Sequence, residues 1–335
     1  MFSILHQKRP EIAIDFGTAN LRIIQRDEGI VFDEPSLCCF SRKSGGAKFV
    51  AAGAEAYAMI DRLPADLQLK SPLRRGVLQD IDAARSLLRY ALSQVQVRRR
   101  LRAPHAIFGV PADATQAERS ALLTAASDAG LGNVRLAAEP FAAAIGAQLP
   151  IAEAAASMVI ECGAGTTEVG VFSLGGLCES GSVRIGGDTL NQAIADQLHF
   201  QRKFLIGEQS AEQLKLAYVA GRERAAACGA VHAVSIKGRS LRNGLPMAID
   251  IHLSELDTVV TKHIDQIVEV VRQVLGRTAP ELSHDIYERG IVLTGGGALM
   301  PLMSGMVSEA TGLDVTIAEQ PFLCVAKGLH QMLLQ

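Results

Sequence analysis

The chain has 335 residues, enough for two domains of ordinary size that each bury a core of their own. Hydrophobic residues make up 48% and charged residues 20%, as in a soluble globular protein, and the formal net charge of −2 excludes a global basic field that would recruit nucleic acid. The sequence lacks the long apolar core of a signal peptide and any run of about 18 apolar residues, so we expect a cytoplasmic protein.

Two segments of the sequence predict the same structural motif, which consists of a strand, a tight turn and a second strand. Residues 11–24 carry an acid, a glycine, an alanine and hydroxyl or amide residues at the turn, namely Asp15, Gly17, Thr18, Ala19 and Asn20. Residues 157–172 repeat the pattern with Glu161, Gly163, Ala164, Gly165, Thr166 and Thr167. This repetition predicts two related lobes that each open with a β-hairpin.

Apolar residues at helical spacing follow each hairpin. In the first half they predict helices over 80–97, 115–129 and 140–148, and Thr115 followed by Glu118 predicts a capping box. In the second half we expect helices over 189–200, 210–220 and 254–275, a hairpin of 232–236 with 247–251, a short buried strand over 291–294 and a terminal helix beginning near Pro321. Alternating strands and helices predict an α/β protein.

A third glycine turn, residues 295–298, follows the strand over 291–294. Glycines let the backbone approach a phosphate closely and direct its N–H groups inward, and hydroxyl and amide side chains add donors. A single such turn is a weak signal. Three of them, each after an apolar strand, predict a ligand held between two lobes.

At these residues the chain resembles the actin, Hsp70 and sugar-kinase superfamily and, within it, the MreB family. The two hairpins are similar to the family's phosphate loops and residues 293–298 to its adenosine-binding turn. Further similar segments are 110–119, 139–146, 182–188, 205–208 and 211–215. The resemblance implies an actin-like (ribonuclease H-like) two-lobed ATPase fold with four subdomains. Lobe I would comprise 1–150 plus 312–335 with an insertion at 33–74, and lobe II would comprise 151–311 with an insertion at 189–249.

The same resemblance implies ATP and Mg²⁺ as cofactors and a role for each matched residue. Asp15 would bind magnesium largely through water, Glu139 would orient the attacking water, and Glu161 would be the second catalytic acid. Glu212 would accept from the ribose hydroxyls and Lys215 would flank the purine. The other implied nucleotide contacts are Gly17, Thr18, Ala19, Asn20, Gly163, Gly165, Thr166, Thr167, Glu208, Gly295, Gly296, Gly297 and Ala298.

Four residues depart from the family pattern. Glu161 stands where the family has aspartate, Ala164 replaces a glycine of the second turn, Leu21 replaces a threonine, and Ala138 replaces a polar or acidic residue before Glu139. A misplacement of about 1 Å can cost roughly a hundredfold in rate. Two interpretations therefore stay open: a slow ATPase coupled to polymerisation, and an actin-fold scaffold that binds ATP with little or no hydrolysis.

The resemblance also implies partners. The chain would polymerise with itself into filaments that serve cell shape or intracellular organisation, and membrane-anchored adaptor proteins would attach to them. Phe2, Ile4 and Leu5, together with the basic run Arg98–Arg102, would contact the inner membrane surface. We therefore expect a peripheral position at the inner membrane face.

Overall fold

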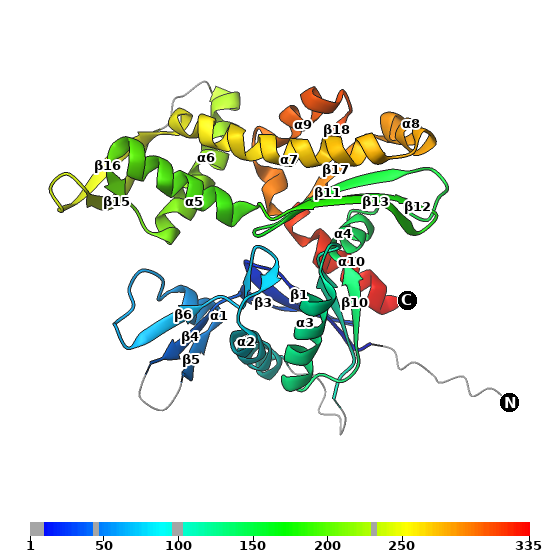
Figure 1. Ribbon diagram of the computed structural model, residues 1–335, viewed down its shortest axis with the longest axis horizontal. Coiled ribbons are helices and arrows are strands. Elements are labelled where there is room, and N and C mark those ends of the chain that lie inside the picture. Colours follow the sequence, from blue (N-terminus) through cyan, green and yellow to red (C-terminus); the bar gives the residue numbers. More distant parts are fainter. Residues whose placement is uncertain (1–9, 43–46, 96–102, 229–232) are drawn as a thin grey trace. The chain divides into compact units, whose positions relative to one another are not determined.

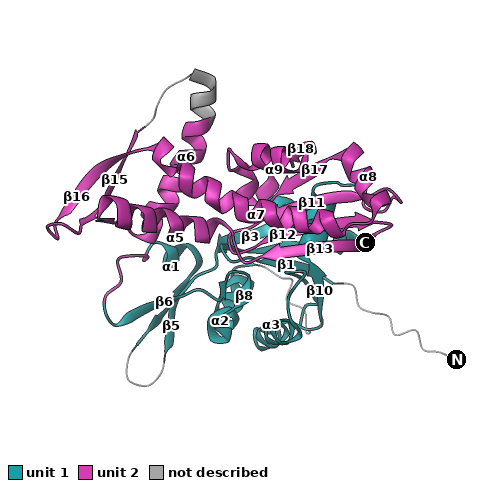
Figure 2. Cartoon of the chain, turned by 45° about the horizontal axis from the view of Figure 1, so that its top comes forward, with its two compact units in different colours: residues 1–58, 65–150, 323–335 teal, residues 59–64, 151–322 magenta. Residues whose placement is uncertain are grey.

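The computed structural model of the chain describes residues 10–42, 47–95, 103–228 and 233–335 (Figure 1). Its contacts divide into two units, shown in different colours in Figure 2. Unit 1 comprises residues 1–58, 65–150 and 323–335, and unit 2 comprises residues 59–64 and 151–322. Residues 312–322 thus lie in unit 2 and not in lobe I as predicted, because the strand Val315–Ile317 pairs with Ile291–Thr294 of unit 2.

The strands and helices have the following bounds. Those of unit 1 are β1 Ile12–Phe16, β2 Asn20–Gln25, β3 Gly29–Pro35, β4 Cys38–Ser41, β5 Lys48–Ala52, α1 Gly53–Tyr57, β6 Leu67–Lys70, β7 Leu73–Arg74, β8 Val77–Leu78, α2 Ile81–Gln94, β9 Ala106–Val110, α3 Gln116–Asp128, β10 Val134–Ala138, α4 Glu139–Gly146 and α10 Cys324–Leu334. Those of unit 2 are β11 Ser157–Cys162, β12 Thr167–Ser173, β13 Gly176–Val183, α5 Gly187–Gln197, β14 Phe204–Leu205, α6 Glu208–Cys228, β15 Ala233–Ser240, β16 Pro246–His252, α7 Asp257–Arg277, α8 Pro280–Arg289, β17 Ile291–Thr294, α9 Met303–Thr311 and β18 Val315–Ile317.

Each unit contains a five-stranded sheet, and the two sheets have the same plan. The order is β10-β9-β1-β2-β3 in unit 1 and β13-β12-β11-β17-β18 in unit 2. In both, a hairpin pairs antiparallel with a third strand on one side and parallel with a later strand on the other. The predicted duplication of a hairpin-led lobe is confirmed by this common topology.

The core of unit 1 follows from the alternation of side chains along β1. Ile12, Ile14 and Phe16 are buried in one cluster with the apolar faces of α2 and α3. Successive strand residues point to opposite faces of a sheet, so Ala13 and Asp15 face the other side. Asp15 is thereby a carboxylate carried on a strand that is buried throughout.

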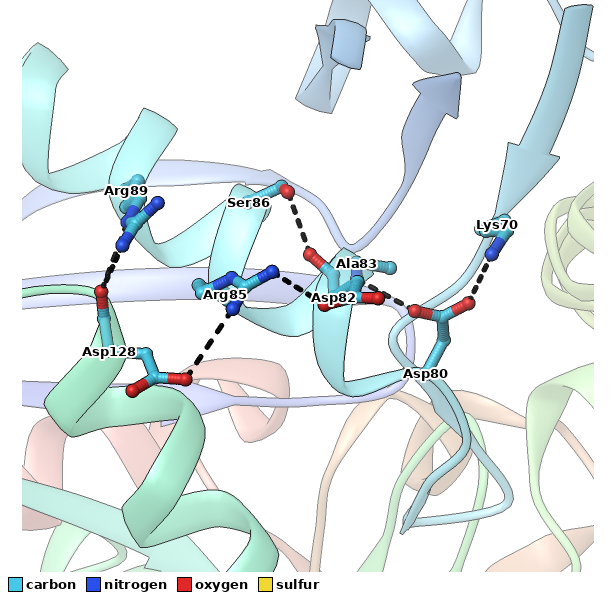
Figure 3. Close-up of polar contacts among 8 residues, drawn as sticks. All are labelled: Lys70, Asp80, Asp82, Ala83, Arg85, Ser86, Arg89 and Asp128. Carbon is cyan, nitrogen blue, oxygen red and sulfur yellow. Dashed lines mark hydrogen bonds and ion pairs between the residues drawn. The ribbon is translucent and has the colours of Figure 1, made fainter. Parts of the chain in front are cut away.

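Helix α2 is anchored by polar contacts at its N-terminal end and along its first two and a half turns (Figure 3). The carboxylate of Asp80 accepts from the Ala83 N–H at 2.8 Å, which is a helix N-cap, and pairs with Lys70 at 2.6 Å. Arg85 bridges Asp82 at 2.6 Å and Asp128, at the end of α3, at 3.5 Å. The helix was predicted over 80–97, and residues 96–97 of that range lie outside the described part of the chain.

Helix α3 begins with the predicted capping box. The Thr115 hydroxyl accepts from the Glu118 N–H at 3.2 Å, and the Glu118 carboxylate accepts from the Thr115 N–H at 2.6 Å. The sequence missed α8 altogether and ended α6 too early, at residue 220. The 295–298 turn leads through a short 3₁₀ segment, Gly296–Leu299, before α9 begins.

Helices α4 and α10 cross at two glycines. A Cβ on Gly146 would overlap the carbonyl oxygen of Cys324, and a Cβ on Gly328 would overlap that of Ala142. The two backbones therefore touch directly, and only glycine fits at either position.

We expect Gly146→Ala to destabilise the protein by about 3 kcal/mol, because the new methyl meets fixed backbone atoms and not a movable side chain. Gly305→Ala in α9 is the matched control, since its Cβ would meet nothing within 4 Å. Removing a helical glycine there should stabilise by about 0.5–1 kcal/mol. Urea unfolding monitored by circular dichroism measures both, and equal midpoints for the two variants would contradict the crossing as described.

Candidate functional site

The first glycine turn joins β1 to β2 and is held by two other segments of unit 1. The Gly17 N–H donates to the Asn20 carbonyl at 2.9 Å, which closes the turn. The Ser36 hydroxyl donates to the Gly17 carbonyl at 2.7 Å, and the Thr18 hydroxyl accepts from the Gly76 N–H at 3.1 Å. A hydroxyl that accepts can still donate its own proton, so Thr18 keeps a donor for a ligand.

Asp15 lies beside this turn, buried and ion-paired. Its Oδ2 is 3.0 Å from Nη1 of Arg22, the residue directly opposite it on β2. Burial raises the pKa of Asp15, and the nearby Arg22 guanidinium acts against that rise. Arg22 also pairs through Nε with Asp33 at 3.0 Å, and Asp33 accepts from the Asn20 amide at 2.6 Å. Sequence reasoning named Asp15 and Asn20 but missed Arg22 and Asp33.

Glu139 is the first residue of α4, where the partial positive charge of a helix N-terminus favours an acid. Its side chain passes over β9, because a Cβ on Gly109 would lie 3.5 Å from the Glu139 Cγ. The residue before it, Ala138, pairs with Val110 at the ends of two parallel strands. The structure thus places the Glu139 carboxylate at this end of the sheet, and its water-orienting role stays a prediction.

The second glycine turn, in unit 2, is closed by the same hydrogen bond as the first. The Gly163 N–H donates to the Thr166 carbonyl at 2.8 Å, matching the bond between Gly17 and Asn20. The start of α5 is bound to the turn, since the Gly187 N–H donates to the Gly163 carbonyl at 3.1 Å and the Asp188 N–H to the Ala164 carbonyl at 2.9 Å.

Two departures from the family pattern can be judged from this geometry. Ala164 does not have a positive φ, so an alanine fits there without backbone strain. Glu161 is buried, and the residue directly opposite it on β12 is another acid, the fully buried Glu168. The first hairpin thus pairs an acid with a cation, and the second pairs an acid with an acid.

The third glycine turn packs against the end of β11. Gly295 has φ +78, and a Cβ on it would overlap the carbonyl of Cys162; a Cβ on Gly297 would lie 2.8 Å from the Cys162 Cβ. Gly296 is exposed, with nothing within 4 Å of its Cβ position. The turn therefore presents an open backbone face at Gly296, while Gly295 and Gly297 fix it to the sheet.

A polar network from α5 and α6 lies beside the second turn. Oε2 of Glu212 accepts from Lys215 at 2.7 Å and from the Asn191 amide at 2.6 Å, and Lys215 also lies 3.5 Å from the Gly187 carbonyl. Glu212 and Lys215, both predicted, are thus brought together with the second turn, and Asn191 was missed. Its signal was weak, because an asparagine inside a helix usually faces solvent.

Charge and burial shift the pKa of several groups in this network. Burial raises the pKa of Asp188 to about 6, with Lys215 acting against the rise and Glu208 and Glu212 adding to it. Burial also raises the pKa of Glu208, reinforced by Asp61 and Glu212. The pKa of His263 on α7 is lowered to about 4 by burial and then by the positive charge of Lys215. Unit 2 thus concentrates acidic groups around one lysine.

The described residues contain no group of three or more histidine, cysteine, aspartate or glutamate side chains arranged to hold a metal. They also contain no helix with both the length and the apolar character needed to cross a bilayer. Residues 1–9 and 96–102, which include the predicted membrane contacts Phe2, Ile4, Leu5 and Arg98–Arg102, lie outside the described part of the chain.

Comparison with known proteins decides the family. The family model described as MreB/Mbl protein matches residues 9–335. The chain belongs to the MreB/Mbl family. It is 40% identical over 325 residues to the cell shape-determining protein MreB of Escherichia coli K12, covering 95% of this chain and 91% of that protein. It is 35% identical over 324 residues to the cell shape-determining protein Mbl of Bacillus subtilis 168, covering 96% and 95%.

Solved structures confirm the fold expected of an MreB/Mbl chain. The crystal structure of MreB5 of Spiroplasma citri bound to AMPPNP superposes with a TM-score of 0.88 at 29% identity, covering 96% of this chain and 95% of that one. A MamK double helical filament matches with a TM-score of 0.77 at 20% identity, covering 96% of this chain and 97% of that one, which is a likeness of fold alone. The predicted α/β, actin-like fold is thereby confirmed.

Because His263 is kept neutral in the fold, we expect the protein to lose stability as pH falls. Between pH 6.5 and about 4 the unfolded chain binds a proton that the folded chain does not, so the loss begins near pH 6.5 and is complete near pH 4. Between pH 7.5 and pH 5, the free energy of unfolding of His263→Leu should therefore fall by about 2 kcal/mol less than that of the wild type.

Urea unfolding at the two pH values measures this difference. Asp188 acts in the opposite direction in both proteins, because its raised pKa favours the folded state as pH falls. The control is His284→Leu at an exposed position on α8, which should follow the wild type. Identical pH dependence of His263→Leu and wild type would show that the histidine is not held neutral.

Proposed function

We propose that this MreB/Mbl chain binds ATP through its glycine turns and assembles into filaments that act in cell shape. The observation that carries the proposal is the pair of matched turns, each closed by a glycine N–H donating to the carbonyl three residues on. Support comes from the likeness to MreB5, whose structure was determined with AMPPNP and with ADP. Backbone N–H groups presented by such turns are suited to phosphate oxygens.

Each turn would contribute a different part of the nucleotide contact. Residues 17–20 and 163–167 would lie along the phosphates, where Thr18 keeps a hydroxyl proton to donate. The open backbone face of Gly296 would take the adenosine, with Gly295, Gly297 and Ala298 holding that face in place. Glu212 would accept from the ribose, held in orientation by Asn191 and Lys215, and Glu208 would contribute negative charge nearby.

Magnesium at Asp15 stays a prediction, and the fit is incomplete. Magnesium in nucleotide sites keeps several waters and needs only one or two protein carboxylates, so a single aspartate suffices in number. The carboxylate of Asp15, however, is already paired with Arg22 at 3.0 Å.

Hydrolysis would depend on Glu139 orienting the attacking water, with Glu161 as the second acid. In phosphoryl transfer the protein contributes mainly by positioning the reacting groups and by stabilising charge on the phosphate oxygens. A second candidate function, an ATP-binding scaffold with little turnover, is favoured by Glu161, which is one carbon longer than the family's aspartate and lies opposite the acid Glu168. In both cases the chain would assemble with itself.

The membrane is the proposed place of assembly. Phe2, Ile4, Leu5 and Arg98–Arg102 would give each subunit a weak contact with the inner membrane surface, and a filament would multiply many weak contacts into firm attachment. The filament would lie at the cytoplasmic face and offer a site to membrane-anchored adaptors. A role in cell-shape control is supported by the relatives named as cell shape-determining proteins.

We expect the purified protein to pellet at high speed with ATP and to stay in solution without nucleotide. A phosphate-release assay on the same samples separates the two candidates, because a slow ATPase releases phosphate above background and a scaffold does not. If phosphate is released, Glu139→Gln should abolish release and keep pelleting, since it removes the acid and preserves the shape of the side chain. Pelleting that is indifferent to nucleotide would refute ATP-dependent assembly.

We expect Glu212→Ala to weaken ATP binding by about tenfold or more, because a hydrogen bond to a charged group contributes about 1.5–3 kcal/mol. Titration with a fluorescent ATP analogue measures the dissociation constant. Glu309→Ala, an exposed acid on α9 of the same unit, is the control for charge and should bind like the wild type. Equal affinities for all three proteins would remove Glu212 from the site.

A further inference from the structure

Arg22 is fixed between two carboxylates at the first turn. The register of β1, β2 and β3 places Asp15, Arg22 and Asp33 in one row across three strands. The Arg22 side chain is 15% exposed and the Asp15 side chain 8%. Asn20, inside the turn, donates to Asp33 and so ties the row to the turn at 2.6 Å. A permanent positive charge is thereby held in a defined position beside Gly17–Asn20.

This charge changes what a metal could do there. A divalent cation near Asp15 would share that carboxylate with a guanidinium and would be repelled by it, since like charges a few ångströms apart disfavour one another. Arginine does not give way by losing its proton, because its pKa stays above about 12 in proteins. A guanidinium has five N–H donors, and the pairs with Asp15 and Asp33 use two of them. The others can donate to phosphate oxygens.

We propose that Arg22 supplies at the first turn much of the positive charge that a magnesium ion would otherwise bring to the phosphates, so that ATP binding by this chain depends little on magnesium. The inference rests on the proposed nucleotide binding. It assigns to Arg22, which the sequence did not single out, the role of a phosphate-binding and cofactor-determining residue.

The test compares the affinity of a fluorescent ATP analogue in excess magnesium with its affinity in EDTA. For the wild type we expect the two dissociation constants to agree within about threefold. In Arg22→Leu the cation is gone and Asp15 is left free to hold a metal, so we expect about a tenfold or greater loss of affinity in EDTA, or about 1.4 kcal/mol. The ratio of the dissociation constants in EDTA and in magnesium is the quantity compared, because a general loss of stability would affect both constants alike.

The matched control is Arg85→Leu, because Arg85 also bridges two aspartates, Asp82 and Asp128, but does so between α2 and α3 (Figure 3). Its ratio should equal that of the wild type. Arg22→Gln, which keeps a polar but shorter and uncharged side chain, serves as a second variant if the leucine variant fails to fold, and it should show the same tenfold loss in EDTA.

Three results would overturn the proposal. The first is a wild-type affinity that falls tenfold or more in EDTA. The second is a folded Arg22 variant whose ratio of affinities in magnesium and in EDTA equals that of the wild type. An equal loss in Arg85→Leu would show that the effect is one of net charge and not of position. Absence of wild-type binding in both buffers is a different outcome, because it refutes the proposed nucleotide site itself.

Discussion

The register of strand pairing in each hairpin is the constraint that places the candidate site residues of the first and second glycine turns. A glycine N–H bonded to the carbonyl three residues later fixes the length of the turn, and the turn length fixes which residues face each other on the strands. In each hairpin the acid lies two residues before this glycine, and it is thereby placed opposite the residue that lies five positions after the glycine. Asp15 faces Arg22 by this rule, and Glu161 faces Glu168 by the same rule.

Because the geometry is common to both hairpins, the difference between them is chemical. In unit 1 a carboxylate is compensated by a cation across the strand pair, and that cation is compensated again by Asp33. In unit 2 the residues at the two matching positions, Glu161 and Glu168, are both acids within a buried strand pair. Opposite charges across a strand pair stabilise a sheet and like charges do not. The two copies of one structural device have therefore diverged in charge while their backbone remained alike.

The sequence predicted the parts of the fold that local chemistry determines. The hairpins, the capping box of Thr115 with Glu118 and the helices α2 to α7 follow from alternation, capping and helical spacing. It failed where tertiary pairing decides. β18 carries only three residues and was assigned to the wrong lobe because its pairing with β17 cannot be read from its own composition. α8 was missed because this ten-residue helix has only two aliphatic residues at helical spacing, Leu282 and Ile286, of which only Ile286 is fully buried.

The same division applies to the site. Glycines and acids of the turns could be named from the sequence because their residue types are unusual after an apolar strand. Arg22 and Asn191 could not, because an arginine on a strand and an asparagine in a helix are ordinary until their partners are known. Once the structure gives the turn length, the partner of Asp15 follows by counting along the second strand.

An arginine opposite Asp15 matters more than its single charge suggests, because its position is determined from two sides. Asp15 is carried on a buried strand and Asp33 on the next strand but one, so the guanidinium cannot move to follow a ligand without breaking one of two ion pairs at 3.0 Å. A group held in this way loses little conformational freedom when a phosphate binds, which lowers the entropic cost of binding. A metal ion, by contrast, must be brought in and partly dehydrated for each binding event. A fixed cation thus favours tight and metal-tolerant binding, whereas a metal that bridges phosphate oxygens also neutralises charge as it develops during transfer. If the chain binds ATP as proposed, Arg22 on the first hairpin and Glu161 on the second would both favour holding the nucleotide over rapid turnover.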